Sequence, residues 1–310
     1  GPARRALSRA VRMLDDRYGV VCFEHEGLAP LLADVRPERW ILTFHNLLSG
    51  VIASELELAP GRRQRWIRKR DLGKARMLER RVLRAYDRCV VCSEDDAAAL
   101  AAIGDASGRI SVIPNGVDLV RIQASSVPSE PRVLFPGTFA YPPNVDGALW
   151  FCSEIWPRII DAVPNAKLLL VGRAPVAKVL ELGQAAGVSL HPDVPSMIPY
   201  LESARAVVVP LRVGTGTRLK ALEAMAAGRP VIGTSVGLAG IGVRDGVTAR
   251  IVDEPHRFAA AVIETLEQDG LAASMGTAGR RHVEAGFGWD RIGRRFVTLV
   301  SELLEGVAAS

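Results

Sequence analysis

Residues 209–231 of the chain read VPLRVGTGTRLKALEAMAAGRPV. An apolar run ends at Pro210, a glycine-rich turn follows it, and a helical pattern opens near Thr217. The helix should stop at Gly228, because glycine commonly ends helices, and Pro230 should lead into the next strand. A strand, a glycine turn and a helix in this order are typical of the βαβ units that build parallel sheets. The stretch therefore predicts an α/β fold.

Short β-branched runs alternate with helical patterns on both sides of this stretch, which predicts two parallel sheets. The expected strands are Val20–Glu24, Trp40–Phe44, Cys89–Cys92, Arg109–Ile113, Val133–Pro136, Lys167–Val171, Val188–His191, Ala206–Leu211 and Pro230–Thr234. The expected helices are Arg4–Tyr18, Arg62–Tyr86, one capped by Ser93, Val145–Ala162, Val176–Ala186, Thr217–Ala227, Phe258–Glu267, Leu271–Ala285 and Trp289–Val307. In the central helix, apolar residues at a spacing of three or four should face the sheet, namely Leu219, Leu222, Met225 and Ala226.

A break in this pattern divides the chain. Pro114-Asn115-Gly116 is a turn sequence, and Gln123–Pro131 is short, polar and proline-bearing, as expected of an interdomain linker. We therefore predict a Rossmann-like domain over residues 1–122 and a second Rossmann-like domain over residues 123–285. The last segment, residues 286–310, is expected to form a helix that packs back towards the first domain.

The composition is that of an ordinary globular protein, with 48% hydrophobic and 24% charged residues. Four cysteines at irregular spacing form no disulfide framework, which favours a reducing compartment. No apolar run approaches the ~20 residues that a membrane-spanning helix needs, and no signal peptide is recognisable. Cys89 and Cys92 form a C-x-x-C sequence on a predicted strand, where positions three apart point to opposite faces, so neither a metal nor a redox site is expected. These observations predict a cytoplasmic protein.

The net charge of +5 is concentrated in one predicted helix. Between Gly61 and Arg88 the chain carries twelve Lys and Arg residues against three Asp and Glu residues. Trp66 and Ile67 among these cations suit an anionic lipid surface, and a solvated helix with ion pairs within the chain explains the pattern equally well. No nucleic-acid-binding motif accompanies the charge, so no nucleic-acid partner is expected. Residues 62–86 are therefore the candidate surface for peripheral contact with the inner face of a membrane.

The glycine-rich turn and the helix after it have the chemistry of an anion site. Four small residues let a phosphate approach the backbone amides and the helix N-terminus, namely Gly214, Thr215, Gly216 and Thr217. Arg218 and Lys220 add two positive charges, and Glu223 shares a helix face with Lys220. Two cations beside one carboxylate suit a diphosphate joined to a ribose, because the carboxylate can accept the ribose hydroxyls. A surface ion pair at an exposed helix start is the structural alternative.

Two nucleotide-binding classes are disfavoured by the sequence. Neither GxxxxGK[ST] nor GxGxxG occurs, which argues against a nucleotide kinase and a dinucleotide dehydrogenase. No D-x-D sequence occurs either, so no metal is expected at the phosphates.

The central stretch resembles the signature of the retaining glycosyltransferases of family 4 (group 1), in which a helix written E-A-M-A-x-G-x-P-V carries a ribose-binding glutamate. Further matches are IPNGVD at 113–118, FPGTFAYPPNVD at 135–146, VSLHPDV at 188–194 and IPYL at 198–201. The resemblance implies a GT-B fold with two Rossmann-like domains facing a cleft. It also implies that the first strand and the glycine-rich loop of the N-terminal domain are absent from this chain.

By this resemblance, Glu223 binds the ribose while Arg218 and Lys220 neutralise the departing diphosphate. The other donor-contacting positions that it implies are Gly214, Thr215, Gly216, Thr217, Gly137, Thr138, Asn144 and Val194. The backbone at Asp193–Val194 corresponds to the part of the family site that reads the base. No cofactor is implied beyond the nucleotide-diphosphate sugar, which is the donor substrate.

The sequence departs from the family pattern at three places. Many relatives have a second glutamate where Thr215 stands, an arginine where Thr138 stands, and Lys-Gly where Asn144-Val145 stands. A subset of the family carries G-x-G-x-R-x-K instead, as here, which suggests that the positive charge has moved to Arg218 and Lys220. The missing glutamate leaves the donor sugar open.

His45 ends the predicted strand Trp40–Phe44, where relatives place a catalytic histidine in the interdomain cleft. A histidine at a strand end can also be purely structural. The mechanism that the resemblance implies is front-face substitution with retention, in which the leaving diphosphate helps to deprotonate the acceptor and Arg218 and Lys220 stabilise its charge.

The sequence therefore predicts transfer of a hexose from a nucleotide-diphosphate sugar to a glycan or lipid-linked acceptor, in cell-surface polysaccharide biosynthesis. A non-catalytic nucleotide-sugar-binding subunit, which needs a partner for the absent N-terminal part, is the alternative. An epimerase of the same fold is disfavoured because the E-A-M-A-x-G signature belongs to transferases.

Overall fold

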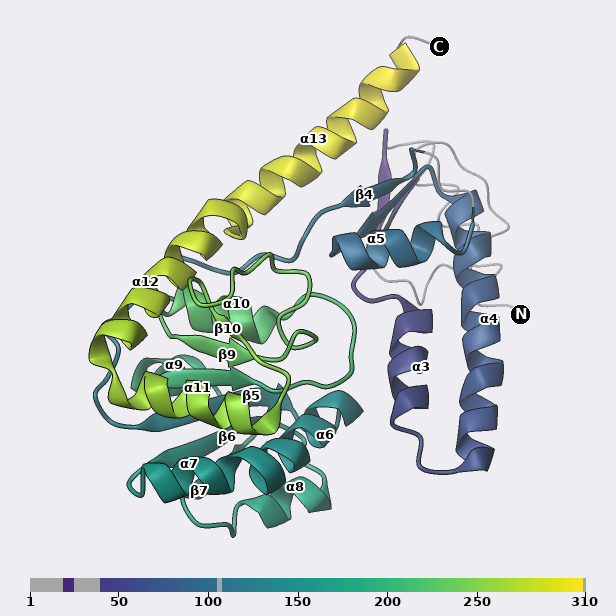
Figure 1. The fold of residues 1–310 in the computed structure, drawn as a ribbon. Helices are drawn as coiled ribbons and strands as arrows, with labels where there is room; N and C mark the ends of the chain where they lie inside the picture. Colours follow the sequence, from purple (N-terminus) through teal and green to yellow (C-terminus); the bar gives the residue numbers. More distant parts are fainter. Residues whose placement is uncertain (1–18, 25–39, 105–107, 309–310) are drawn as a thin grey trace. The chain divides into compact units, whose positions relative to one another are not determined.

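The computed structural model describes residues 19–24, 40–104 and 108–308, and the other residues are drawn as a grey trace (Figure 1). The helix expected at Arg4–Tyr18 lies outside the described residues. The chain forms two compact units. The N-terminal unit comprises Gly1–Asn115, Thr215–Thr217 and Asp290–Ser310, and the C-terminal unit comprises Gly116–Gly214 and Arg218–Trp289.

The N-terminal unit is built on a sheet of four parallel strands in chain order. These strands are β1 (Val21–Phe23), β2 (Trp40–Phe44), β3 (Arg88–Val91) and β4 (Ile110–Val112). The helices are α3 (Leu48–Glu57), α4 (Arg62–Ala85), α5 (Glu94–Ala101) and α13 (Trp289–Ala308). The predicted strands, the long basic helix and the helix after Ser93 are confirmed, whereas α3 was not predicted.

Hydrophobic cores lie on both faces of this sheet. On one face, the rings of Phe23 and Trp40 lie 4.7 Å apart and both pack against Tyr86 at the end of α4. On the other face, α13 contributes Ile292 and Leu299 to a core with residues of β2 and β3. The sheet is therefore covered on both sides, as parallel sheets require.

Local capping explains where two of the helices begin. The Ser93 hydroxyl accepts a hydrogen bond from the Asp96 amide at 3.1 Å, which confirms the predicted N-cap of α5. The N-terminus of α3 is held by the buried Glu79 of α4, whose carboxylate accepts from the Ser49 amide at 2.8 Å. Burial raises the pKa of Glu79, so this contact joins α3 and α4 at the cost of desolvating a carboxylate.

The C-terminal unit contains a sheet of six parallel strands in the order β10-β9-β8-β5-β6-β7. The bounds are β5 (Arg132–Thr138), β6 (Lys167–Arg173), β7 (Val188–Pro192), β8 (Ala206–Val209), β9 (Val231–Gly233) and β10 (Arg250–Ile251). All five predicted strands are present, and β10 adds a short sixth strand at the edge beside β9. The predicted α/β fold with two parallel sheets is confirmed.

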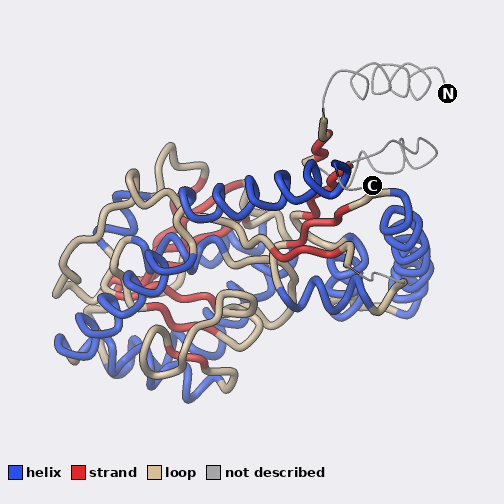
Figure 2. The backbone as a smooth tube through the Cα atoms, turned by 90° about the horizontal axis from the view of Figure 1, so that it is seen from above, coloured by secondary structure: helices blue, strands red, loops and turns tan. Residues whose placement is uncertain are grey.

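Helices cover both faces of the six-stranded sheet, and Figure 2 shows its strands in red with helices around them. These elements are α6 (Pro142–Trp150), the π-helical turn η2 (Phe151–Ile155), α7 (Trp156–Ala162), α8 (Ala177–Leu182), α9 (Ile198–Ser203), α10 (Leu219–Ala226), α11 (Pro255–Glu267) and α12 (Asp269–Gly286). One core contains Phe135, Phe151 and Phe258, and the opposite core contains Leu134 and Leu222. The helix predicted over Val145–Ala162 is thus three consecutive helical segments.

One predicted core position is wrong. Leu222, Met225 and Ala226 of α10 are buried, but Leu219 is 44% exposed. Leu219 is the first residue of α10, with Arg218 as N-cap, so it lies at the carboxyl edge of the sheet, where the strands end and do not cover it.

The segment Gln123–Pro131, which the sequence suggested as a linker, is bound within the C-terminal unit. The buried Arg229 donates to the carbonyls of Ser125 and Ser126, each at 2.8 Å, and the buried Arg205 donates to the Pro128 carbonyl at 3.0 Å. These charge-assisted bonds hold the segment against the unit. The boundary between the compact units falls instead in the Pro114-Asn115-Gly116 turn.

Candidate functional site

The strand order of the C-terminal unit predicts where a ligand binds. Counted within this unit, the six strands have the order 6-5-4-1-2-3, so the chain reverses direction across the sheet between β5 and β8. In open parallel sheets, ligands bind at the carboxyl ends of the two strands that flank this reversal. Gly137 lies at this end of β5, and Pro210 directly follows β8. The glycine-rich turn and the start of α10 follow from there.

Lys220 is fixed at this position by residues that follow β5. Its Nζ donates a hydrogen bond to Oδ1 of the buried Asn144 at 2.7 Å and lies 5.4 Å from the centre of the Phe135 ring. The Asn144 amide nitrogen donates in turn to the Thr138 carbonyl at 2.9 Å. A Cβ atom at Gly137 would lie 3.2 Å from Cγ of Asn144, so glycine gives the amide room at this strand end. Thr138 itself is exposed at the edge.

The environment of Lys220 lowers the pKa of its ammonium group. Desolvation by burial, together with the nearby Arg218 guanidinium, lowers the pKa of Lys220 to about 7. A cation destabilised in this way gains strongly from an anionic ligand, because a phosphate would restore the balance of charge. The group is therefore suited to hold a phosphate.

Arg218 supplies the second cation and is buried, with 6% of its surface exposed. Its Nε donates to the Val236 carbonyl at 3.0 Å. Gly214 has a φ of +137°, and a Cβ atom there would lie 3.3 Å from the Arg218 guanidinium. Both the backbone conformation and the contact therefore require glycine at position 214.

Glu223 lies on the same helix as Lys220 and is partly buried. Burial raises the pKa of Glu223, and the positive charge of Arg121 opposes this shift. Among the described residues, no ion pair joins Lys220 to Glu223, and Lys220 bonds to Asn144 instead. The surface ion pair considered above is therefore not what the structure contains.

The ion pair between Arg212 and Asp146 was not predicted from the sequence. Arg212 Nε donates to the Asp146 carboxylate at 2.9 Å, with a second bond from its Nη2, and the guanidinium lies 5.5 Å from the centre of the Trp150 ring. Arg212 stands two residues before Gly214, at the start of the glycine-rich turn, and Asp146 and Trp150 belong to α6. The pair thus attaches the start of the turn to α6. Its residues lie 66 positions apart, and no sequence pattern joins them.

The carboxyl ends of β6 and β7 carry unusual backbone conformations. Ala174 has a φ of +48° and Asp193 a φ of +49°, values that side-chain-bearing residues rarely adopt. The Asp193 carboxylate accepts a hydrogen bond from the Ala174 amide at 3.0 Å, which joins the two strand ends. Val194, the residue expected near the base, follows directly and is partly buried. Strain of this kind is concentrated at functional edges.

The remaining predicted site residues belong to the N-terminal unit. His45 follows β2, and its Nε2 lies 3.8 Å from the Glu24 carboxylate at the end of β1. Its side chain is 44% exposed. Thr215, Gly216 and Thr217 are grouped with this unit. The structure therefore brings together six predicted residues of the C-terminal unit, namely Lys220, Asn144, Gly137, Thr138, Arg218 and Gly214. Glu223 lies on the same helix as Lys220, Val194 follows β7, and His45 and Thr215–Thr217 belong to the other unit.

The C-x-x-C thiols are both buried and free. Burial raises the pKa of Cys89 to about 12 and that of Cys92 to about 11, so neither is a reactive thiolate at neutral pH. The Cys92 thiol donates to the Phe44 carbonyl at 3.4 Å, which is a packing role.

Comparisons with known proteins match both halves of the chain to glycosyltransferases. Residues 130–268 match the family model described as glycosyl transferases group 1, and residues 2–121 match that of glycosyltransferase family 4. A D-inositol 3-phosphate glycosyltransferase from Thermobispora bispora is 35% identical over 131 residues, which cover 41% of this chain and 30% of the relative. The alignments with the first curated relatives span 30–60% of those proteins' own lengths.

Two solved structures share the fold across nearly the whole chain. Sucrose-phosphate synthase from Thermosynechococcus elongatus has a TM-score of 0.75 at 24% identity and covers 98% of this chain and 78% of its own. The Anabaena protein HepE, solved with UDP and glucose, has a TM-score of 0.71 at 16% identity and covers 95% and 80%. At these identities the likeness establishes the GT-B fold. With family models matched in both halves, the chain belongs to the group 1, family 4 glycosyltransferases.

Proposed function

We propose that this chain transfers a hexose from a nucleotide-diphosphate sugar to a glycan or lipid-linked acceptor, with retention of anomeric configuration and without a metal. The observation that carries the proposal is the Lys220 ammonium, held 2.7 Å from Asn144 where the sheet topology predicts a ligand. Arg218, the second cation, lies close enough to lower the pKa of Lys220. Glu223 lies one helical turn further along α10.

Each part of the donor has a matching group in this arrangement. The two cations are suited to the diphosphate, whose negative charge grows as the sugar leaves, so they would stabilise the transition state more than the ground state. The partly buried Glu223 carboxylate is suited to accept hydrogen bonds from the ribose hydroxyls. The strained end of β7 at Asp193 and Val194 is the proposed place of the base. His45 is proposed to act at the donor sugar.

Family membership and the HepE complex with UDP and glucose support a nucleotide-sugar donor for this chain. Retention, a glycan or lipid-linked acceptor and a role in cell-surface polysaccharide biosynthesis are proposed from the family resemblance. The preference for a base and a sugar is open to direct measurement.

Turnover of nucleotide sugars tests the proposal. The full chain is incubated with UDP- and GDP-sugars, with and without glycan acceptors, and release of the nucleoside diphosphate is measured in the presence and absence of EDTA. We expect release by the wild type in both conditions, and a loss of about 100-fold or more in Lys220→Ala, since one charge-stabilising group contributes about 3 kcal/mol to such a transition state. Donor binding without any release would favour the nucleotide-sugar-binding subunit instead.

We also propose that α4 holds the protein at an anionic membrane surface. Its buried face includes Ala75, Glu79 and Val82, while its outer face exposes Trp66 by 63% and Met77 by 71% among basic side chains. Two exposed apolar side chains within a cationic helix face match the chemistry of lipid headgroups and the acyl boundary below them. No helix in the described ranges is long and apolar enough to cross a membrane.

A further inference from the structure

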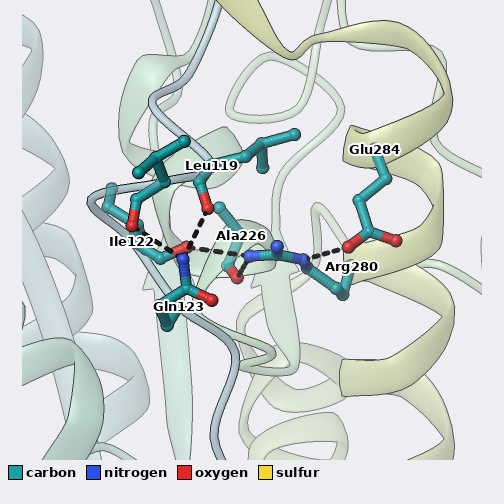
Figure 3. Close-up of polar contacts among 7 residues, drawn as sticks. Leu119, Ile122, Gln123, Ala226, Arg280 and Glu284 are labelled. Carbon is teal, nitrogen blue, oxygen red and sulfur yellow. Dashed lines mark hydrogen bonds and ion pairs between the residues drawn. The ribbon is translucent and has the colours of Figure 1, made fainter.

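Arg280 of α12 joins two segments of the C-terminal unit through their backbone carbonyls (Figure 3). Its Nη1 donates to the Ile122 carbonyl at 2.8 Å and to the Ala226 carbonyl at 2.5 Å. Its Nε donates to the Glu284 carboxylate at 2.6 Å. The Arg280 side chain is 15% exposed, so most of this guanidinium is shielded from water.

Each of the two carbonyls lies next to a group that matters for the site. Ala226 is the last residue of α10, three positions after Glu223. Ile122 directly follows Arg121, whose positive charge opposes the rise in the pKa of Glu223. Arg280 therefore joins α10, which carries Glu223, to the turn that carries Arg121.

The turn is closed by its own hydrogen bonds, so a bond to the Ile122 carbonyl also restrains the backbone of Arg121. The Asp118 carboxylate accepts from the amides of Val120 at 3.0 Å and Arg121 at 2.8 Å. The Gln123 side-chain amide donates to the carbonyls of Leu119 at 3.0 Å and Val120 at 2.7 Å (Figure 3). Side-chain hydrogen bonds from Asp118 and Gln123 thus close the turn formed by residues 118–123.

We propose that Arg280 is a positioning residue for donor binding, which fixes the backbone beside Arg121 against the end of α10, the helix that carries Glu223, by donating to both the Ile122 and the Ala226 carbonyls. This inference rests on the proposed function of Glu223 as the acceptor of the ribose hydroxyls. The positive charge of Arg121 opposes the rise in the pKa of Glu223 that burial causes, so its position affects how readily this carboxyl group ionises. An ionised carboxylate accepts two hydrogen bonds, whereas a protonated one presents a donor to the ribose.

The contact with Glu284 provides a matched control. Glu284 is 48% exposed and pairs with Arg280 one turn along the same helix, so this ion pair is screened by solvent. Removing its charge leaves both carbonyl contacts in place. A positioning role therefore requires the guanidinium and not the ion pair.

The test compares donor KM, kcat and the pH profile of donor KM in the full chain and in Arg280→Ala, Arg280→Lys, Arg121→Ala and Glu284→Gln. We expect Arg280→Ala to raise donor KM about tenfold with kcat within about twofold, since two buried carbonyls lose their donor. Arg280→Lys should recover part of this loss, because an ammonium can still donate to both carbonyls. Glu284→Gln should match the wild type. In Arg121→Ala and Arg280→Ala, the acidic limb of the KM profile should move to higher pH.

An unchanged KM and an unchanged acidic limb in Arg280→Ala, with only a lower Tm, would overturn the inference. If Arg280→Ala does not fold, Arg121→Ala takes its place in the test. An acidic limb of the KM profile in Arg121→Ala that coincides with that of the wild type would then overturn the inference. If the wild type turns over no donor, the proposed function is wrong. The positioning of Glu223 can then still be measured by NMR titration of its carboxyl group, whose midpoint should move to higher pH in Arg121→Ala.

Discussion

The ammonium of Lys220 lies 2.7 Å from Oδ1 of Asn144, although 76 positions separate the two residues in the chain. The family resemblance implies a lysine at position 144, and the lysine beside this position comes instead from α10. An uncharged amide at position 144 can accept a hydrogen bond from the Lys220 ammonium and so fix its position.

Asn144→Asp tests this relationship through charge. An aspartate would accept the same hydrogen bond and also neutralise the Lys220 ammonium, so the diphosphate would meet no net charge there. We expect the Kd for UDP or GDP to rise at least about tenfold, because a charge-assisted contact contributes about 1.5–3 kcal/mol. Isothermal titration calorimetry measures this.

Asn144→Ser is the matched control, since it shortens the side chain without adding charge. A smaller loss in the serine variant than in the aspartate variant is expected. Equal losses would mean that shape, and not charge, governs the contact at this position.

Donor binding should depend on the charge of Lys220 and therefore on pH. The pKa of Lys220 is lowered to about 7, so the free protein carries this charge at pH 6 and has largely lost it at pH 8.5. A diphosphate binds the protonated form, so its Kd should rise with pH above about 7, by up to about tenfold per unit. Lys220→Arg keeps its charge throughout this range.

The measurement is a series of UDP or GDP titrations between pH 6 and pH 9 on both proteins, because the ligand's own titration then cancels. The wild type should lose affinity relative to Lys220→Arg as the pH rises. Parallel curves for the two proteins would show that Lys220 is not the titrating group.

The strands and the cation pair could be predicted from the sequence because the signals are local. Buried parallel strands are continuous apolar runs, and Arg218, Lys220 and Glu223 stand within one helical turn and a half of each other. Helix α3 was missed because LSGVIASELE holds a glycine and two serines and its N-cap Leu47 makes no side-chain cap. Its start is stabilised by Glu79 from another helix.

Contacts between segments that are far apart in the chain could not be predicted, because they have no recognisable pattern in the sequence. Arg280, Arg229 and Arg205 donate to backbone carbonyls, and every residue type offers the same carbonyl. The segment Gln123–Pro131 accordingly has the composition of a linker while being bound in the C-terminal unit. Lys220 and Asn144 could each be predicted as site residues, but their mutual contact depends on where the sheet places the starts of α6 and α10.

Replacing Ala174 by glycine should stabilise the C-terminal unit. Ala174 has a φ of +48°, where a Cβ atom costs about 1 kcal/mol and glycine does not. We expect the Tm of this unit to rise by about 2–4 °C, measured by calorimetry. Ala260→Gly is the matched control, because Ala260 is exposed within α11 and glycine there should lower stability by about 1 kcal/mol. A loss of stability in both variants would contradict the strain at position 174.

The pair of Arg212 and Asp146 should act on the glycine-rich turn. Removing either partner frees the start of this turn, so donor KM should rise in Arg212→Ala and in Asp146→Ala. The double variant should be no worse than the single ones, with a coupling energy of about 0.5–1 kcal/mol, since Arg212 is half exposed. Strictly additive losses in this double-mutant cycle would mean that the two residues act independently.

Vesicle binding distinguishes a membrane-facing helix from a merely solvated one. The variant carries glutamate at three exposed cations of α4, namely Arg65, Lys69 and Lys74. The matched control carries glutamate at three exposed cations of the C-terminal unit, namely Lys167, Lys178 and Arg257, so the net charge changes equally. At about 1 kcal/mol for each cation near an anionic surface, the α4 variant should lose about 100-fold in affinity for phosphatidylserine vesicles.

The control variant should bind these vesicles almost as the wild type does, because none of its substituted residues belongs to α4. Trp66→Ala should weaken vesicle binding more at high salt than at low salt, because salt screens the charge contribution and leaves the apolar contact. Co-sedimentation with phosphatidylserine and with pure phosphatidylcholine vesicles measures all of these. Equal losses in the two triple variants would assign the attraction to net charge alone, and no binding by the wild type would leave α4 as a solvated helix.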